Sequence, residues 1–247
     1  MPDTTASPAI ATSTPAPRGL VGRVIAVLTS PRAGYAEVAR HPRWLAALAF
    51  SLMMTMAASF VFFSTEVGQQ ASLDQQLRTL ESFGQHVSDA QYDRMQSMRS
   101  LTPFFAAVGQ LITLPLAALV VAGLSFAVLT AGFGGSASFR QVFAVVAHSG
   151  FLIVLQQLFV LPLDYARQTL TSPANLAVFL PFLDENTFAA RLFGSIDMFI
   201  VWWLMSLAIG LGVLYKRKTA PIATTFFVVY GVLGLTLATI RTVMAGT

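Results

Sequence analysis

Long apolar stretches alternate with short polar ones along the chain after residue 43. A helix needs roughly 20 apolar residues to cross a hydrocarbon core about 30 Å thick. Five stretches reach this length, at residues 44–64, 101–133, 141–163, 193–215 and 221–244. The pattern predicts an all-α membrane protein, a bundle of about five transmembrane helices preceded by interfacial amphipathic helices.

The polar stretches divide the rest of the chain. Residues 1–17 are mostly Pro, Ala, Ser and Thr, a composition that predicts a disordered N-terminal tail. Residues 18–43 are expected to form cytoplasmic interfacial helices, and residues 44–247 the five-span transmembrane domain. Residues 65–100 and 164–192 would then be its two large external loops.

Composition agrees with a membrane location. Hydrophobic residues make up 55% of the 247 residues and charged residues only 11%, whereas a soluble domain carries about 25% charged residues. The net charge of +4 fits the basic bias of cytoplasmic loops, so no nucleic-acid partner is expected. The chain has no cysteine, which excludes disulfides and thiolate metal sites.

Basic residues set the expected orientation, because cytoplasmic loops are enriched in Lys and Arg. With the N-terminus inside, the cytoplasmic parts hold nine basic residues, which are Arg18, Arg23, Arg32, Arg40, Arg43, Arg140, Lys216, Arg217 and Lys218. Only two acids, Asp3 and Glu37, share that side. The N-terminus is therefore expected in the cytoplasm, and the C-terminus, after five spans, outside.

The segment before the first span has helical periodicity. Leu20, Val21, Val24, Ile25 and Leu28 form an apolar face that two arginines flank. A helix start at Ser30-Pro31 then predicts a second short helix ending near Arg40. The expected membrane-interface contacts are Arg18, Arg23, Val24, Ile25, Arg32, Arg40, Arg43 and Trp44. The alternative is that the segment docks on protein, against the cytoplasmic turns near Gly134 and Lys216.

Few side chains capable of chemistry occur within the expected spans. Asp197 and Arg241 fall near the outer ends of the fourth and fifth spans, and Gln110, Gln156 and Gln157 fall in the same half. We expect an intramembrane polar cluster, either a structural ion pair with hydrogen-bonded amides or a path for a substrate or proton.

Motifs of the common hydrolases and nucleotide-binding proteins are absent from the sequence, which has no H-E-x-x-H, Walker loop or G-x-S-x-G. His148 is expected to bond between helices, and neither it nor His41 has a carboxylate cluster nearby in sequence. We therefore expect no catalytic residue, no metal site and no cofactor.

Two phrases of the sequence resemble the bacterial branch of the Yip-one family of five-span membrane proteins. They are LTSPRAGYAEVARHPRW at residues 28–44 and FGGSASFRQVFAVVAHSG at residues 133–150, and the resemblance covers residues 20–244. It implies a membrane protein that acts in hetero-oligomers without known catalysis, as eukaryotic members do in vesicle traffic. Rab binding is not carried over, because bacteria have no Rab system and this chain lacks a long acidic N-terminal region.

Taken together, these features predict a non-enzymatic protein of the bacterial inner membrane. It would act as a scaffold or accessory subunit that contacts the lipid bilayer and binds other membrane proteins, or copies of itself, or organises lipid. The alternative is a small transporter or permease-like component with a polar path near Asp197 and Arg241.

Overall fold

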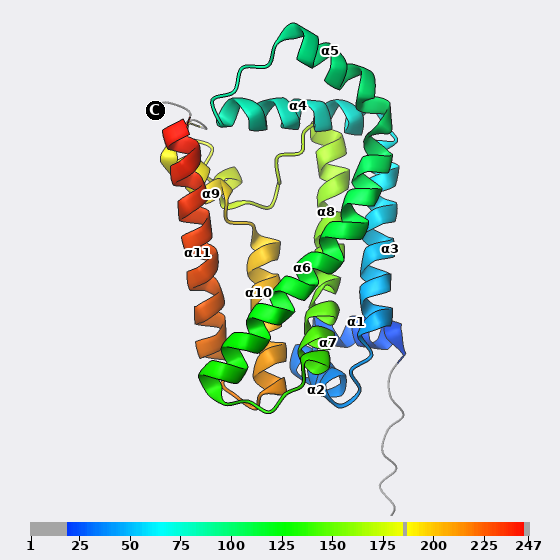
Figure 1. Cartoon of the computed structure of the whole chain (residues 1–247), viewed down its shortest axis with the longest axis vertical. Coiled ribbons are helices and arrows are strands. Elements are labelled where there is room, and N and C mark those ends of the chain that lie inside the picture. The colour runs from blue at the N-terminus through cyan, green and yellow to red at the C-terminus, as the bar shows by residue number, and fades with distance from the viewer. Residues whose placement is uncertain (1–18, 185–186, 245–247) are drawn as a thin grey trace, which may run out of the picture.

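The computed structural model describes residues 19–184 and 187–244, and the predicted tail at residues 1–17 lies outside this range. The described residues form eleven α-helices and two short 3-10 helices (Figure 1). In chain order the elements are α1 (Leu20–Thr29), α2 (Pro31–Arg40), α3 (Trp44–Phe63), α4 (Glu66–Ser82), α5 (Asp89–Met98), η1 (Arg99–Leu101), α6 (Thr102–Phe133), α7 (Phe139–Ser149), α8 (Phe151–Arg167), η2 (Leu176–Phe179), α9 (Phe188–Gly194), α10 (Met198–Leu214) and α11 (Thr219–Met244).

Four helical stretches in the described part of the chain are long and apolar enough to cross a membrane. They are α3, the continuous stretch from α5 through α6, the α7–α8 pair, and α11. The apolar helix α10 is shorter, with 17 residues, or about 25 Å. It lies beside α11 in the bundle (Figure 1). The all-α membrane bundle expected from the apolar pattern is confirmed.

Asp197 interrupts the apolar segment at residues 193–215. Helix α9 ends at Gly194, and α10 begins only at Met198. The Asp197 carboxylate accepts hydrogen bonds from the backbone N–H groups of Phe199 and Ile200, as an N-terminal cap does. Asp197 therefore stands before the helix rather than within it.

Local sequence also explains the turn between α6 and α7. Helix α6 ends at Phe133, and the capping residue Gly134 adopts a left-handed conformation with φ of 64° that favours glycine. Helix α7 then starts with a capping box, in which Ser138 and Gln141 satisfy each other's backbone N–H groups.

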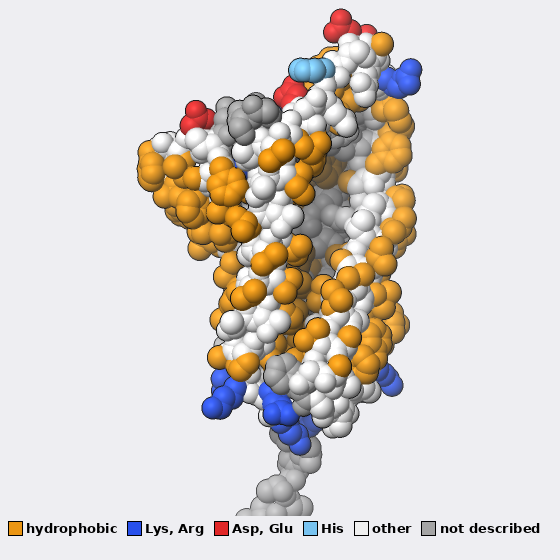
Figure 2. Space-filling model, turned by 60° about the vertical axis from the view of Figure 1, so that its left-hand side comes forward, with side chains coloured by type: hydrophobic (Ala, Val, Ile, Leu, Met, Phe, Trp, Pro, Cys, Tyr) orange, Lys and Arg blue, Asp and Glu red, His pale blue; other side chains and the backbone are white. Residues whose placement is uncertain are grey.

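The two ends of the bundle differ in charge. Figure 2 shows most Lys and Arg side chains at the lower end and Asp and Glu at the upper end. We call the lower end, which carries Arg32, Arg40, Arg140 and residues 216–218, the basic end. At the opposite end, α4 lies across the bundle and contacts α3, α6 and α11 (Figure 1).

The most densely packed part of the bundle lies toward the basic end, around α7. Every residue of α7 from Val142 to Ser149 is buried, and these side chains pack against Tyr35 and Val38 of α2 and against Leu207 of α10. Helices α6 and α11 lie at the periphery instead. Only 11% and 17% of the residues in their most apolar windows are buried, against 50% for α7–α8.

Candidate functional site

The N-terminal helix pair, α1 and α2, packs against the bundle rather than lying apart from it. Helix α2 contacts α7 and α10, and α1 contacts α7 and α8. The two helices of the pair approach closely at Gly34, where a Cβ atom would lie 2.9 Å from the Val27 backbone nitrogen. A larger residue at Gly34 would therefore separate α1 from α2.

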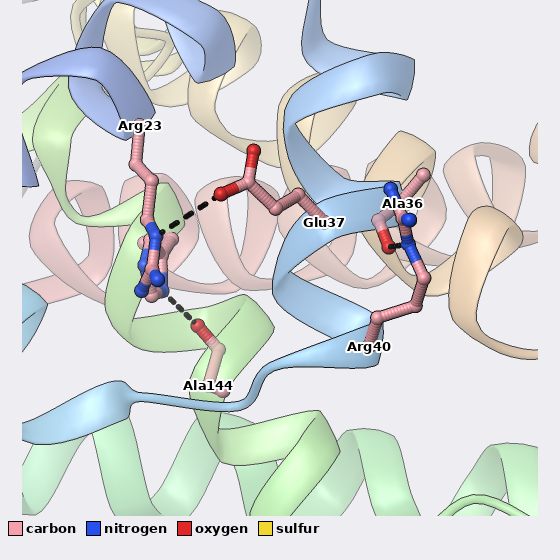
Figure 3. Close-up of polar contacts among 6 residues, drawn as sticks. Arg23, Ala36, Glu37, Arg40 and Ala144 are labelled. Carbon is pink, nitrogen blue, oxygen red and sulfur yellow. Dashed lines mark hydrogen bonds and ion pairs between the residues drawn. The ribbon is translucent and has the colours of Figure 1, made fainter. Parts of the chain in front are cut away.

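A buried ion pair joins the two helices. Arg23 of α1 and Glu37 of α2 point toward each other, with 3.6 Å between Nε and Oε1 (Figure 3). Their side chains are only 5% and 11% exposed. Two charges removed from water need each other, because a lone buried charge costs several kcal/mol. The pair therefore holds α1 and α2 in one register.

His148 of α7 lies near this ion pair and is fully buried. Both Arg23 and Glu37 act on it electrostatically. Its Nδ1 lies 2.7 Å from the carbonyl oxygen of Ala144, one turn earlier in the same helix, and its ring contacts that of Phe151 edge-on. The expected bond between helices is thus wrong, because the backbone of its own helix supplies the partner.

Tyr35 anchors α2 to α10. Its phenol is fully buried, and its hydroxyl lies 2.9 Å from the Ser206 hydroxyl. Burial raises the pKa of the Tyr35 phenol, so the phenol stays neutral and can donate this bond. The ring rests on Gly210, where a Cβ atom would meet Val145 at 2.6 Å and the Tyr35 ring at 2.9 Å. Glycine at position 210 therefore makes room for the ring.

A backbone contact and a ring contact complete the interface. The side-chain amide of Gln141 donates a hydrogen bond of 3.1 Å to the backbone carbonyl of Ala39, which ties the start of α7 to the end of α2. The rings of Trp44 and Phe143 meet edge-on, with centroids 5.0 Å apart. The two phrases that carry the family resemblance, residues 28–44 and 133–150, thus lie against each other and form most of this site.

The residues predicted to contact lipid headgroups differ in their surroundings. Arg18 lies outside the described residues. Arg23 is buried at 4% exposure against Glu37, so the prediction is wrong for Arg23. Val24 and Trp44 are half-buried against the core, whereas Ile25 is exposed. The exposed arginines are Arg32, Arg40 and Arg43.

Helix α1 therefore has one side packed on the protein and one exposed side. Arg23, Ala26 and Val27 face the protein, while Val21 and Ile25 are 71% and 55% exposed on the other side. The inner side of α1 docks on protein, as the alternative expected, but the contacts are with α7 and α8, and docking against the turns near Gly134 and Lys216 remains a prediction. Contact of Val21 and Ile25 with lipid remains a prediction.

The polar residues expected near the outer ends of the spans do not form one cluster. The Asp197 carboxylate caps α10 and accepts a bond of 2.7 Å from Ser172, and its backbone N–H donates to Tyr230. Arg241 is tied through its backbone carbonyl, which accepts a bond of 3.0 Å from Arg191. The expected ion pair between Asp197 and Arg241 is not formed.

Two of the three glutamines bond to the same residue of α3. The amides of Gln110 on α6 and Gln157 on α8 both donate to the Ser59 hydroxyl on α3, Gln110 at 2.8 Å. Gln157 also donates to the Thr55 carbonyl at 3.3 Å. Gln156 is half-buried beside Gln157 on α8. This second polar site binds α3, α6 and α8 together.

Sequence reasoning missed the Arg23, Glu37 and His148 site, although a signal exists. At 100° per residue, Arg23 lies on the same side of α1 as Leu20 and Val27 rather than at its edge. A charge in that position requires a buried partner. The side chain of Glu37, on the next helix, supplies it.

The contacts of Arg23, Glu37 and His148 serve to hold helices together. Arg23 and Glu37 pair with each other, His148 Nδ1 lies against the Ala144 carbonyl, and all three side chains are buried. Within residues 19–184 and 187–244, no three His, Cys, Asp or Glu side chains gather as metal ligands would. What the geometry provides is a rigid attachment of the N-terminal helix pair to α7 and α10.

The fold and the site together define a multi-pass α-helical membrane protein whose N-terminal helices are locked onto the bundle. The Yip1 domain model matches residues 25–240. The chain therefore belongs to the Yip1 domain family, as the two phrases indicated. Comparison with curated proteins gave no match, and neither did comparison with solved structures.

Proposed function

We propose that the protein is a non-enzymatic scaffold or accessory subunit of the bacterial inner membrane that binds other membrane proteins or organises lipid. The basic end would face the cytoplasm, with the N-terminus inside and the C-terminus outside. Membership of the Yip1 domain family supports a membrane-embedded role in protein interaction. The proposed binding surface is an exposed apolar face of the bundle, on helix α6.

The observation that carries the proposal is the exposed face of α6. Ile112, Leu116 and Val120 are 60%, 56% and 51% exposed and follow each other at helical spacing. Gly109 and Gly123 lie on the same side, and a Cβ atom at either would meet nothing within 4 Å. Glycine has no internal packing reason at these positions, whereas helices that pack in membranes use small residues for close approach.

Photocrosslinking in native membranes tests this role. A photoreactive residue at Val120 should give a discrete crosslinked product with a partner protein or a second copy of the chain. Gly123→Leu should remove that product while the protein still folds, because the position faces open space. Met53 of α3, which is 65% exposed, is the matched control site and should give no discrete product. Equal products from both sites, unaffected by Gly123→Leu, would contradict the proposal.

The transporter alternative requires a polar path shared by Asp197 and Arg241. The Asp197 carboxylate instead caps α10 and bonds to Ser172, and Arg241 is bonded through its backbone. The glutamine site belongs to α3, α6 and α8. The residues named for a path therefore favour helix attachment over transport.

A further inference from the structure

A pocket of 720 Å³ opens at the basic end where α2, α10 and α11 meet. Its rim carries the basic side chains of Arg32, Lys216 and Lys218, all on exposed residues. Its wall continues along the bundle through Val213, Ala223 and Met205. Met205 lies nine residues before the end of α10 at Leu214, so the pocket extends about 14 Å along the helix toward the middle of the bilayer.

We infer that this pocket binds the headgroup of an anionic phospholipid, with an acyl chain along the apolar wall. Cations at the rim attract a phosphate, and basic pockets between membrane helices are the sites that anionic headgroups occupy. A free phosphate would use only the rim. The apolar wall below the rim gives a reason to choose a lipid over a soluble anion.

The backbone at Lys216 supports a built site. Helix α10 ends in a Schellman motif, in which the Arg217 N–H donates to the Gly212 carbonyl at 2.8 Å and the Lys216 N–H donates to the Val213 carbonyl. In this motif the residue that follows the C-cap adopts a left-handed conformation, and glycine usually occupies that position. Here Lys216 adopts a φ of 53° at that position. Lys216, which lines the pocket, therefore stands at the position of the turn that glycine usually occupies.

Close packing of the turn gives the pocket its shape. A Cβ atom at Gly212 would lie 3.1 Å from the Arg217 carbonyl and 3.2 Å from the Thr219 hydroxyl. The turn therefore folds tightly against α10 and brings Lys216 and Lys218 to the same rim. Helix α11 begins at Thr219, so its first backbone N–H groups add to the positive potential there.

The lipid pocket lies apart from the exposed face of α6 that is proposed to bind a partner. The crosslinking test at Val120 can therefore fail without affecting the inference about lipid. Native mass spectrometry of the full-length protein with added phosphatidylglycerol tests it. The pocket variant Lys216→Gly with Arg32→Gln should weaken the tightest lipid-binding event about 25-fold, or about five-fold for each lost charge. Glycine suits the backbone at position 216, so this variant should melt no lower than the parent in phosphatidylcholine.

The matched control is Arg40→Gln with Arg43→Gln, which removes the same charge from the same end outside the pocket. It should change the affinity by less than about twofold. Equal losses in both variants would overturn the inference, because they would show general attraction to a basic surface.

Two further arms separate a lipid from a soluble anion. Met205→Gln, at an exposed position of the apolar wall, should weaken phosphatidylglycerol several-fold and leave glycerol phosphate unaffected. Glycerol phosphate alone should bind at least 100-fold more weakly than the lipid. Binding of both with equal affinity would overturn the assignment to a phospholipid.

Discussion

Arg23 of α1 and Glu37 of α2 form a buried ion pair 3.6 Å apart, near His148 of α7. The charges are fourteen residues apart in sequence and lie on two helices too short to be stable alone. Their burial means that the N-terminal helix pair and the bundle fold as one unit. The pair also explains why an arginine in an apolar helix does not face lipid.

Loss of one charge should be costly, whereas loss of both should not. Glu37→Leu or Arg23→Met alone should lower the free energy of unfolding by about 3 kcal/mol, because each breaks the ion pair while the other charge stays buried. The double variant should recover most of that loss. Unfolding in mixed micelles monitored by Trp fluorescence measures all three. Additive losses would show that the two residues do not interact in the folded protein.

Gly210 should tolerate no larger residue. Gly210→Ala places a methyl group within 2.6 Å of Val145 and 2.9 Å of the Tyr35 ring, and should cost about 1–3 kcal/mol. Gly231→Ala on α11 is the matched control, since a Cβ atom there meets nothing within 4 Å. Thermal unfolding of the two purified variants compares them. Similar melting temperatures would show that α2 does not press against α10.

Asp197 and Arg241 should act independently. Asp197→Ala removes a helix cap and a bond to Ser172, and should cost about 1–2 kcal/mol. Adding Arg241→Ala should change the free energy of unfolding by the sum of the single effects, within about 0.5 kcal/mol. A double-mutant cycle measures the coupling. A coupling energy above about 1 kcal/mol would show that the two side chains meet after all.

The orientation can be tested by cysteine labelling, since the chain has no native cysteine. With the basic end inside, a membrane-impermeant maleimide should label Gln85→Cys in intact spheroplasts and Arg40→Cys only in inverted vesicles. Both residues are exposed, at opposite ends of the bundle. The reverse labelling pattern would contradict the proposed orientation.

The apolar pattern was sufficient to predict the membrane bundle, because about 20 consecutive apolar residues have few alternatives to a membrane helix. The two sequence phrases were sufficient to indicate the family. Neither could place Arg23, whose surroundings depend on how α2 packs back onto α1. The ion pair needs a close contact at Gly34, which only the folded chain brings about.

The polar cluster near the outer ends could not be placed for a related reason. Distance from the end of a span gives the depth of Asp197, Arg241 and the glutamines, but not the direction in which each points. Asp197 found partners in its own backbone and in Ser172 of the preceding loop. Such local bonds compete with long-range pairs. Depth alone therefore overestimated how many residues would meet.

The most direct test of the docked helix pair is the reactivity of single cysteines on α2. Val38 is fully buried and Ala33 is exposed, five residues apart on the same short helix. In vesicles with the basic end accessible, maleimide should label Val38→Cys at least about 100-fold more slowly than Ala33→Cys, because labelling requires α2 to open. Adding Gly210→Ala should speed labelling at position 38 and leave position 33 unchanged. Equal rates at positions 38 and 33 in the parent would contradict the account, because they would mean that α2 lies free of the bundle.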